Sequence, residues 1–215
     1  MRVAFPLILL LLAGLGHAGE IDAKVEAALA AESRPEADAE RDRNRKPLAT
    51  LKFFGLEDDM TVLELIPGGG WYTRVLAPVL AENGKLYVAL GTNYVSENVL
   101  TEPGFEKVEV IETDANIRRP EGSRYYALDD FEFGISGVDM VLTFRNVHNF
   151  DPESRARMNR AVFDTLKSGG DFPDSRAPCG AWCGRPRRTG RRTSACRTRH
   201  GSSARVIRGR SCGRS

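Results

Sequence analysis

A strand-like run that leads directly into three consecutive glycines constrains the fold of this chain more than any other feature. Residues 61–66 are almost all β-branched or aliphatic, with the single acid Glu64 among them, which is typical of a strand buried on both faces. The turn Pro67-Gly68-Gly69-Gly70 follows at once. Apolar residues at helical spacing then occupy residues 75–80, where Pro78 is expected to kink or shorten the helix. This order predicts the start of a βαβ unit.

Further strands and helices alternate along the rest of the chain. Three more strands are predicted, at residues 85–90, 107–112 and 138–144. Asp151 and Pro152 are expected to open another helix as its N-cap and first residue, and Gly169 to end it. Strands that alternate with helices predict a mainly parallel sheet, and therefore an α/β domain over residues 56–170. Residues 115–137 carry no pattern that assigns them to an element.

The N-terminal residues 1–18 have the three-part layout of a signal peptide. Arg2 supplies a positive start, residues 3–15 are apolar, and small residues flank an expected cut after Ala18. The apolar run is shorter than the roughly 20 residues that a membrane-spanning helix needs. We therefore expect a periplasmic or secreted protein with no stable membrane insertion after cleavage. An N-terminal core helix is the alternative.

Residues 19–55 are predicted to form a helical extension. Three helices are expected there, over residues 20–32, 33–46 and 48–54. Ser33 and Glu36 form the pattern of a capping box at the start of the second helix, and Gly55 is expected to end the third. The second helix is polar almost throughout, and we interpret its charges as a solvated helix face: Arg41, Asp42, Arg45 and Lys46.

Residues 171–215 differ in composition from the rest of the chain. They hold 12 Arg, 2 Asp and no Lys, Glu or Leu, whereas residues 1–170 hold 27 acidic and 19 basic residues. Because so few large apolar residues cannot build a core, we expect this tail to be disordered and the C-terminal strands of the sheet to be missing. Our hypothesis is that the reading frame was lost near Gly170, which the nucleotide sequence would test.

All four cysteines lie in this tail. Cys179, Cys183, Cys196 and His200 approximate the spacing of a zinc finger. The segment between the two pairs offers almost no apolar residue for the core of a finger, and exported thiols readily oxidise, so we expect no metal site. The arginines have no interleaved aromatic residues, so we expect no nucleic-acid partner. A protein that binds a partner through its basic tail stays an alternative function.

The glycine turn has a physical use in ligand binding. Glycines let a ligand approach the backbone, and the N-terminus of the following helix supplies free N–H groups. A dinucleotide site would need a third glycine where Thr73 stands, and an acid after the second strand, where Leu90 and Gly91 stand. The sequence therefore disfavours NAD. A tight strand–helix connection without a ligand is the alternative.

The same residues resemble the first motif of class I S-adenosylmethionine-dependent methyltransferases, which reads acid-x-Gly-x-Gly-x-Gly. Glu64 to Gly70 matches it except for Ile66 at the first glycine. Residues 34–170 resemble a predicted, often exported, bacterial family of these enzymes. The resemblance rests on Arg34-Pro35, Asp38, Arg41-Asp42, Arg45-Lys46-Pro47, residues 65–70, residues 139–149 and Lys167-Ser168-Gly169-Gly170. It implies a three-layer, Rossmann-like methyltransferase sheet, S-adenosylmethionine as cofactor, and a small-molecule acceptor of unknown identity.

The resemblance also implies roles for single residues. The amino-acid and ribose part of the cofactor would lie against Glu64, Pro67, Gly68, Gly69 and Gly70. Asp114 would lie beside the adenine, whereas Leu90 stands where the fold usually has a ribose-binding carboxylate. His148 could remove a proton from the acceptor, Asn146 could orient a reactant, and Arg145 could hold an anionic group of the acceptor or cofactor.

Each role has a structural alternative. His148 could be a hydrogen-bonded structural histidine, Asp114 a plain loop acid, and Glu64 the cap of a loop. A protein that binds a small ligand without catalysis is an alternative function on the same fold. Loss of the C-terminal strands would impair catalysis in this copy.

Overall fold

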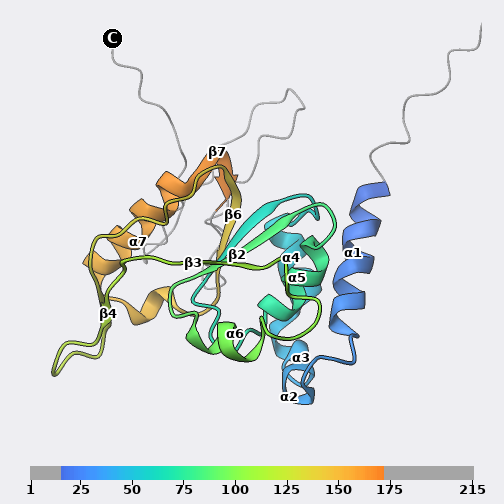
Figure 1. Ribbon diagram of the computed structural model, residues 1–215, viewed down its shortest axis with the longest axis horizontal. Helices are drawn as coiled ribbons and strands as arrows, with labels where there is room; N and C mark the ends of the chain where they lie inside the picture. The colour runs from blue at the N-terminus through green and yellow to red at the C-terminus, as the bar shows by residue number, and fades with distance from the viewer. Residues whose placement is uncertain (1–15, 172–215) are drawn as a thin grey trace, which may run out of the picture.

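The computed structural model describes residues 16–171 of the chain, and the remaining residues lie outside the described part (Figure 1). The body of the expected signal peptide and nearly all of the tail, with its cysteines and the expected disorder, therefore lie outside the described residues. The expected cut after Ala18 falls within the first described helix, α1 (Gly16–Leu29). No helix within residues 16–171 is long and apolar enough to cross a membrane.

A parallel sheet of five strands forms the centre of the domain (Figure 1). Its strand order is β3-β2-β1-β6-β7, with every neighbouring pair parallel. The strands are β1 (Thr61–Leu65), β2 (Lys85–Ala89), β3 (Glu109–Ile111), β6 (Val138–Thr143) and β7 (Leu166–Asp171). The predictions of a parallel sheet and of its first four strands are confirmed, each within two residues at either end.

Helices cover both faces of this sheet, so the α/β, three-layer prediction is confirmed. One layer contains α1, α4 (Pro47–Phe54), α5 (Thr73–Leu80) and α6 (Asn93–Asn98). The other layer contains α7 (Pro152–Thr165). In β1, the buried Val62 belongs to the cluster under α5, and its neighbour Leu63 belongs to the cluster under α7. The apolar residues of β1 therefore serve both layers, because successive side chains point to opposite faces of a strand.

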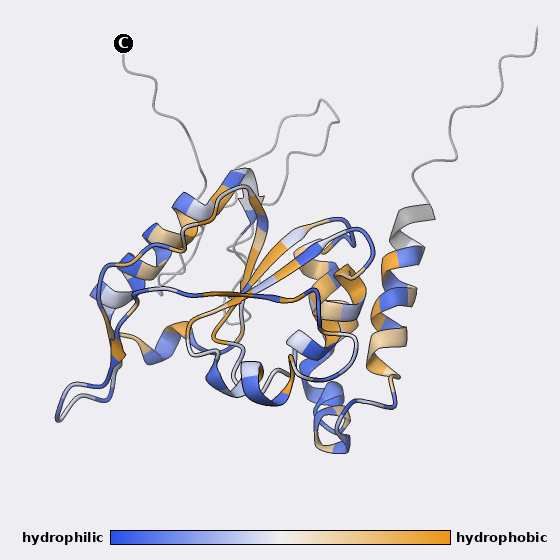
Figure 2. Ribbon diagram, viewed as in Figure 1, coloured by the Kyte–Doolittle hydropathy of each residue, from blue (hydrophilic) through white to orange (hydrophobic). Residues whose placement is uncertain are grey.

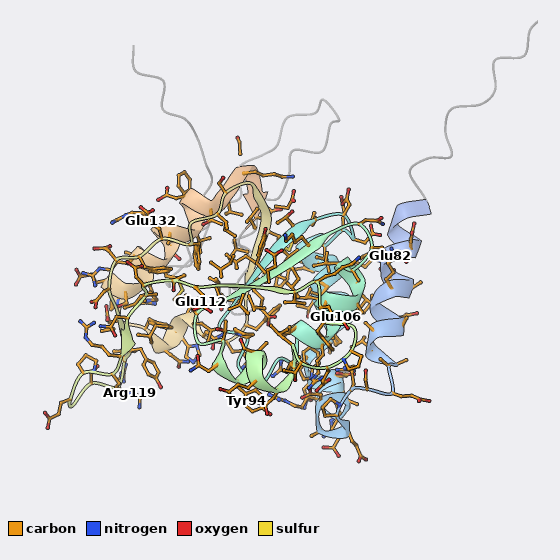
Figure 3. The ribbon with its side chains drawn as sticks, viewed as in Figure 1. Glu82, Tyr94, Glu106, Glu112, Arg119 and Glu132 are labelled. Atoms are coloured by element: carbon orange, nitrogen blue, oxygen red, sulfur yellow. The ribbon has the colours of Figure 1, made fainter. Side chains whose placement is uncertain are left out.

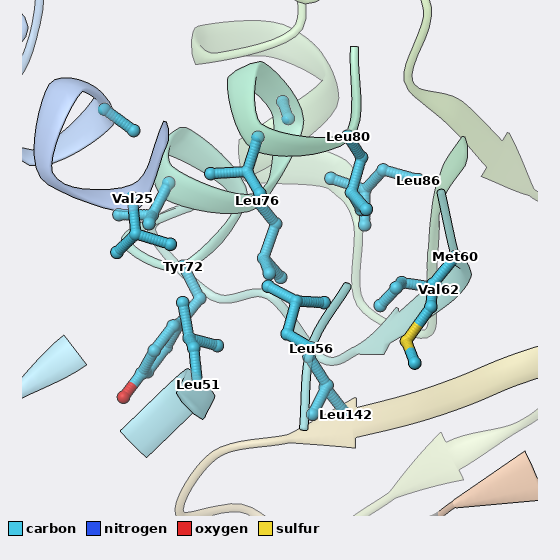
Figure 4. Close-up of a cluster of buried hydrophobic side chains, with 14 of the residues drawn as sticks. Val25, Leu51, Leu56, Met60, Val62, Tyr72, Leu76, Leu80, Leu86 and Leu142 are labelled. Atoms are coloured by element: carbon cyan, nitrogen blue, oxygen red, sulfur yellow. The ribbon is translucent and has the colours of Figure 1, made fainter. Parts of the chain in front are cut away.

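The N-terminal extension packs onto the α/β domain and shares its core. Val25 of α1, Leu51 of α4 and Leu76 of α5 meet Val62 of β1 and Leu142 of β6 in one cluster (Figure 4). Figure 2 shows hydrophobic residues concentrated on the central strands and on α5, whereas the short helices that follow α1 are largely hydrophilic. Residues 19–55 therefore form part of the layer that positions the glycine turn.

The segment that sequence patterns left unassigned, residues 115–137, lies on the α7 side of the sheet. It contains an antiparallel pair, β4 (Ile117–Arg118) and β5 (Ala127–Leu128), whose connecting loop projects from the domain (Figure 1). Phe131 and Phe133 follow, and both are buried in the cluster of α7. The segment thus covers part of the sheet without regular secondary structure of its own beyond this hairpin.

The single polar helix predicted over residues 33–46 is wrong. The structure has two short helices instead, α2 (Glu36–Ala39) and α3 (Asp42–Arg45). The capping box at Ser33 is not formed, because Pro35 is the N-cap residue of α2 and no side chain caps it. With no apolar stripe to bury, a longer helix in this segment gains little from packing. Lys46 then adopts φ +46° and turns the chain into α4.

The last helix begins as predicted and ends differently. The Asp151 carboxylate accepts hydrogen bonds from the Glu153 and Ser154 amides, so the predicted N-cap of α7 is confirmed. The helix ends at Thr165 rather than at Gly169, and the chain passes directly into β7. Sequence patterns predict the end of the helix over these residues and no strand, and two glycines are unfavourable within a strand. β7 is an edge strand, and its pairing with β6 is irregular, which is consistent with this composition.

The turn between α5 and β2 gives a test of the packing. A Cβ atom at Gly84 would lie 2.6 Å from the backbone oxygens of Asp58 and Met60, whereas one at Gly69 would meet nothing within 4 Å. We expect Gly84→Ala to lower the free energy of unfolding by about 1–3 kcal/mol, because backbone atoms must move. Gly69→Ala should change it by less than about 0.5 kcal/mol. Urea unfolding of both variants checks this, and equal midpoints would contradict the close approach.

Candidate functional site

The three central strands end at the same edge of the sheet. Leu65 of β1 lies in register with Ala89 of β2 and with Thr143 of β6. The strand order reverses between β1 and β6, and ligands of open α/β sheets bind at this switch point. Just beyond the three strands, one non-glycine residue in each connection has a left-handed backbone: Ile66 (φ +54°), Leu90 (φ +63°) and Arg145 (φ +65°).

Ile66 joins β1 to the glycine turn and is held from both neighbouring strands. Its amide donates to the Ala89 carbonyl oxygen at 2.9 Å, and its carbonyl oxygen accepts from Asn146 Nδ2 at 3.1 Å. Ile66 was the departure from the glycine motif in the sequence comparison above. Its backbone adopts a conformation that glycine reaches without strain, so the turn has a glycine-like path despite the side chain.

The three glycines of the turn have different structural roles. At Gly70, φ is +78°, and a Cβ atom would lie 2.8 Å from Val99 Cγ2, so this residue allows the turn to pack against the end of α6. Gly68 and Gly69 are exposed, and a Cβ atom at either would meet nothing within 4 Å. The first two glycines therefore leave open space above the turn, whereas the third serves packing.

Glu64 is a buried acid one residue before the end of β1. Its side chain shares the face of the sheet that α5 covers, and the Thr73 hydroxyl donates to Glu64 Oε2 at 2.7 Å. Burial raises the pKa of Glu64 to about 7, although the Thr73 hydrogen bond and the charge of Arg45 act in the opposite direction. The carboxyl group therefore changes its protonation near neutral pH, a property that is more frequent at functional sites than elsewhere.

Two cavities border this edge of the sheet and share Ile66 and Asn146. The smaller has a volume of about 220 Å³ and lies over the glycine turn. The larger has a volume of about 590 Å³ and lies over the ends of β2 and β3. Within residues 16–171, no group of three or more His, Cys, Asp or Glu residues is placed to hold a metal ion.

The smaller cavity is lined by β1, the glycine turn and the short N-terminal helices. Glu64, Gly68 and Gly69 line it from one element, and Asp38, Arg41 and Arg45 line it from α2, α3 and their connection. Our interpretation of the α3 charges as a solvated face is wrong for Arg45, whose side chain is partly buried and whose guanidinium lies 4.4 Å from the centre of the Trp71 ring. Sequence spacing alone gave no signal that these segments meet.

The larger cavity is lined from the ends of β2 and β3 and from the β5 side. Leu90 and Glu112 contribute from the strand ends, and Tyr126 and Asn149 from the opposite side. Glu112 is exposed and is labelled near the middle of the view in Figure 3. Asp114, the residue expected beside the adenine, is exposed and does not line the cavity, although Thr113 and Ala115 do. The sequence analysis missed Glu112, which is the carboxylate of this cavity.

Of the three site residues predicted after β6, only one lies in the cavity walls. Asn146 lines both cavities, and its side chain donates to the Ile66 carbonyl oxygen. Arg145 is exposed, and so is His148 in the short helix η1 (Val147–Asn149); neither lines either cavity. The structure therefore brings Asn146 together with Glu64, Pro67, Gly68 and Gly69, and it places Arg145 and His148 outside the cavity walls.

No family model and no curated protein matches the chain. Among solved structures, it is similar to a SAM-dependent methyltransferase from Aquifex aeolicus (21% identity, 71% of each chain, TM-score 0.46). It is also similar to precorrin-6y C5,15-methyltransferase from Geobacter metallireducens GS-15 (18% identity, 58% of this chain and 57% of that chain, TM-score 0.40). A SAM-dependent O-methyltransferase from Thermotoga maritima matches at 14% identity over 65% of this chain and 49% of that chain, with a TM-score of 0.43. The chain spans less than two thirds of the length of the last two proteins.

The raised pKa of Glu64 predicts a dependence of stability on pH. An unfolded glutamate has a pKa of about 4.3, so between about pH 4.5 and 7 the unfolded chain releases a proton that the folded chain keeps. The free energy of unfolding should therefore fall by up to about 3 kcal/mol as the pH rises through this window.

Glu64→Gln removes the titration, so its stability relative to the wild type should rise by that amount between pH 4.5 and 7.5. Urea unfolding at both pH values measures the change. Glu132→Gln, at an exposed position, is the control and should show no such rise. Parallel pH profiles of Glu64→Gln and the wild type would contradict the assignment.

Proposed function

We propose that this protein binds S-adenosylmethionine at the carboxyl edge of its sheet and transfers the methyl group to a small-molecule acceptor. The observation that carries the proposal is the pair of cavities at the switch point, which share Ile66 and Asn146 in their walls, with Glu64 and the open glycines on one side. The resemblance of residues 64–70 to the first methyltransferase motif supports the same cofactor.

The residues present fit this cofactor in three respects. The larger cavity, at about 590 Å³, falls within the range of small-molecule sites and suits the adenosine part. Leu90 has no carboxylate for the ribose hydroxyls, and Glu112, which lines the same cavity, supplies one. The smaller cavity contains both acidic and basic side chains, as the amino-acid end of the cofactor requires. Gly68 and Gly69 leave the space above the turn that a ligand would need.

When bound, S-adenosylmethionine supplies a methyl group that is already activated for displacement. The protein then mainly has to hold the acceptor in line with it. Asn146 suits this task, because its side-chain amide is anchored on Ile66 between the two cavities. His148 is the candidate base of the sequence analysis, and its place outside the cavity walls makes its role separable from cofactor binding.

A charge placed on the glycine turn tests the cofactor site. We expect the wild-type protein to bind S-adenosylhomocysteine in calorimetry. Gly69→Asp should weaken binding at least roughly tenfold, because a carboxylate would project into the smaller cavity and repel the carboxylate of the ligand. Gly69→Asn has nearly the same size and no charge, so it should weaken binding less. Absence of binding by the wild-type protein would contradict the proposal.

Replacing His148 separates binding from chemistry. His148→Ala should leave the dissociation constant of S-adenosylhomocysteine within about twofold of the wild type, because the residue lines neither cavity. If His148 acts as the base, transfer to an acceptor identified by mass spectrometry should fall by roughly a hundredfold or more. Unchanged turnover would show that His148 has a structural role, and a large loss of cofactor affinity would show that it contacts the cofactor.

A further inference from the structure

Arg45 and Glu64 line the smaller cavity from opposite elements without forming an ion pair with each other. Arg45 and Glu64 both border this space of about 220 Å³. No carboxylate within residues 16–171 lies within ion-pair distance of the Arg45 guanidinium; the nearby Arg41, by contrast, approaches Asp38 at 3.9 Å. The cavity therefore presents a guanidinium and a carboxyl group that both border the same small space.

Arg45 is placed by aromatic contacts rather than by an acceptor. Its guanidinium lies 4.4 Å from the centre of the Trp71 ring and 5.6 Å from that of Tyr72. A guanidinium carries five N–H donors, and stacking on rings leaves them available to a planar carboxylate, which matches their geometry. Burial and the positive charges of Arg41 and Arg145 lower the pKa of Arg45. A bound anion would offset this repulsion.

Polar contacts hold α3, which carries Arg45, and link α2 to Trp71, the residue that follows the glycine turn. The Trp71 indole Nε1 donates to the Asp38 carbonyl oxygen at 2.9 Å. Arg34 forms a two-pronged ion pair with Asp42, with both N···O distances 2.9 Å, and its side chain is only 3% exposed. These contacts set the position of α3 over the glycine turn and therefore the position of Arg45 at the cavity.

We infer that Arg45 binds the carboxylate of an α-amino-acid group in the smaller cavity, with Asp38 and Glu64 as the acids beside its ammonium group. The inference rests on the proposed function, in which this group is the amino-acid end of S-adenosylmethionine. It makes the N-terminal extension, rather than the sheet alone, part of the cofactor site. The same arrangement would discriminate against ligands that lack the carboxylate.

A pair of ligands that differ only in this carboxylate tests the inference. Calorimetry of the full-length protein would compare S-adenosylmethionine with its decarboxylated analogue. We expect the wild type to prefer S-adenosylmethionine by roughly tenfold to a hundredfold, as for a hydrogen bond between charged groups. Arg45→Met should remove this preference by weakening S-adenosylmethionine alone. It should leave the affinity for the decarboxylated analogue within about threefold of the wild type.

Two further variants keep the test decisive. Arg43 lies on the same short helix at an exposed position, so Arg43→Met should keep the full preference for S-adenosylmethionine. Arg45→Lys retains the charge without the fork of N–H groups, so its preference should be smaller than that of the wild type but still present; it serves if Arg45→Met does not fold. If the wild type binds both ligands and the Arg45 variants keep its preference or lose both affinities equally, the inference is wrong. If the wild type binds neither ligand, the proposed function itself is wrong.

Discussion

The left-handed turn at Ile66 is the constraint on which the site depends. A β-branched residue in this conformation is strained by roughly 1–2 kcal/mol, and φ at Ile66 is +54°. The strain is held by hydrogen bonds to both sides, from the Ile66 amide to Ala89 on β2 and from Asn146 after β6 to the Ile66 carbonyl oxygen. The turn thereby leads the chain away from β1 towards α5, opens the space over Gly68 and Gly69, and separates the two cavities.

The same backbone conformation recurs where the neighbouring strands end, at Leu90 and Arg145. Strained residues persist where the surrounding structure over-determines them, and they concentrate at functional sites. Here the flanking strands are buried and parallel, so the bends fall together at one edge of the sheet. The clustering of three such bends at the switch point therefore supports a ligand site there.

Sequence patterns could predict the sheet and the glycine turn because both depend on local properties. A continuous apolar run such as β1 suits burial on both faces, and the cap at Asp151 needs only its own helix. The second helix was mispredicted because polar residues with helical spacing do not show whether a tertiary partner exists. Arg45 and Glu112 join the site through contacts between segments far apart in the chain, which spacing does not reveal. Ile66 could not be predicted to have a positive φ, since its side chain disfavours one.

Within the N-terminal extension, α2 and α3 have no apolar stripe and are held in place by polar contacts instead. α2 and α3 bury little apolar surface, so they cannot rely on hydrophobic packing, and their position is set by Arg34 with Asp42 and by Trp71 with Asp38. Charged and polar contacts of this kind hold a segment less firmly than a core does, because their net free energies are small once desolvation is counted. A ligand carboxylate on Arg45 would add an anion where positive charges now repel one another. Binding would therefore stabilise α3 over the turn, because the ligand would add a favourable contact to a segment that the core does not hold.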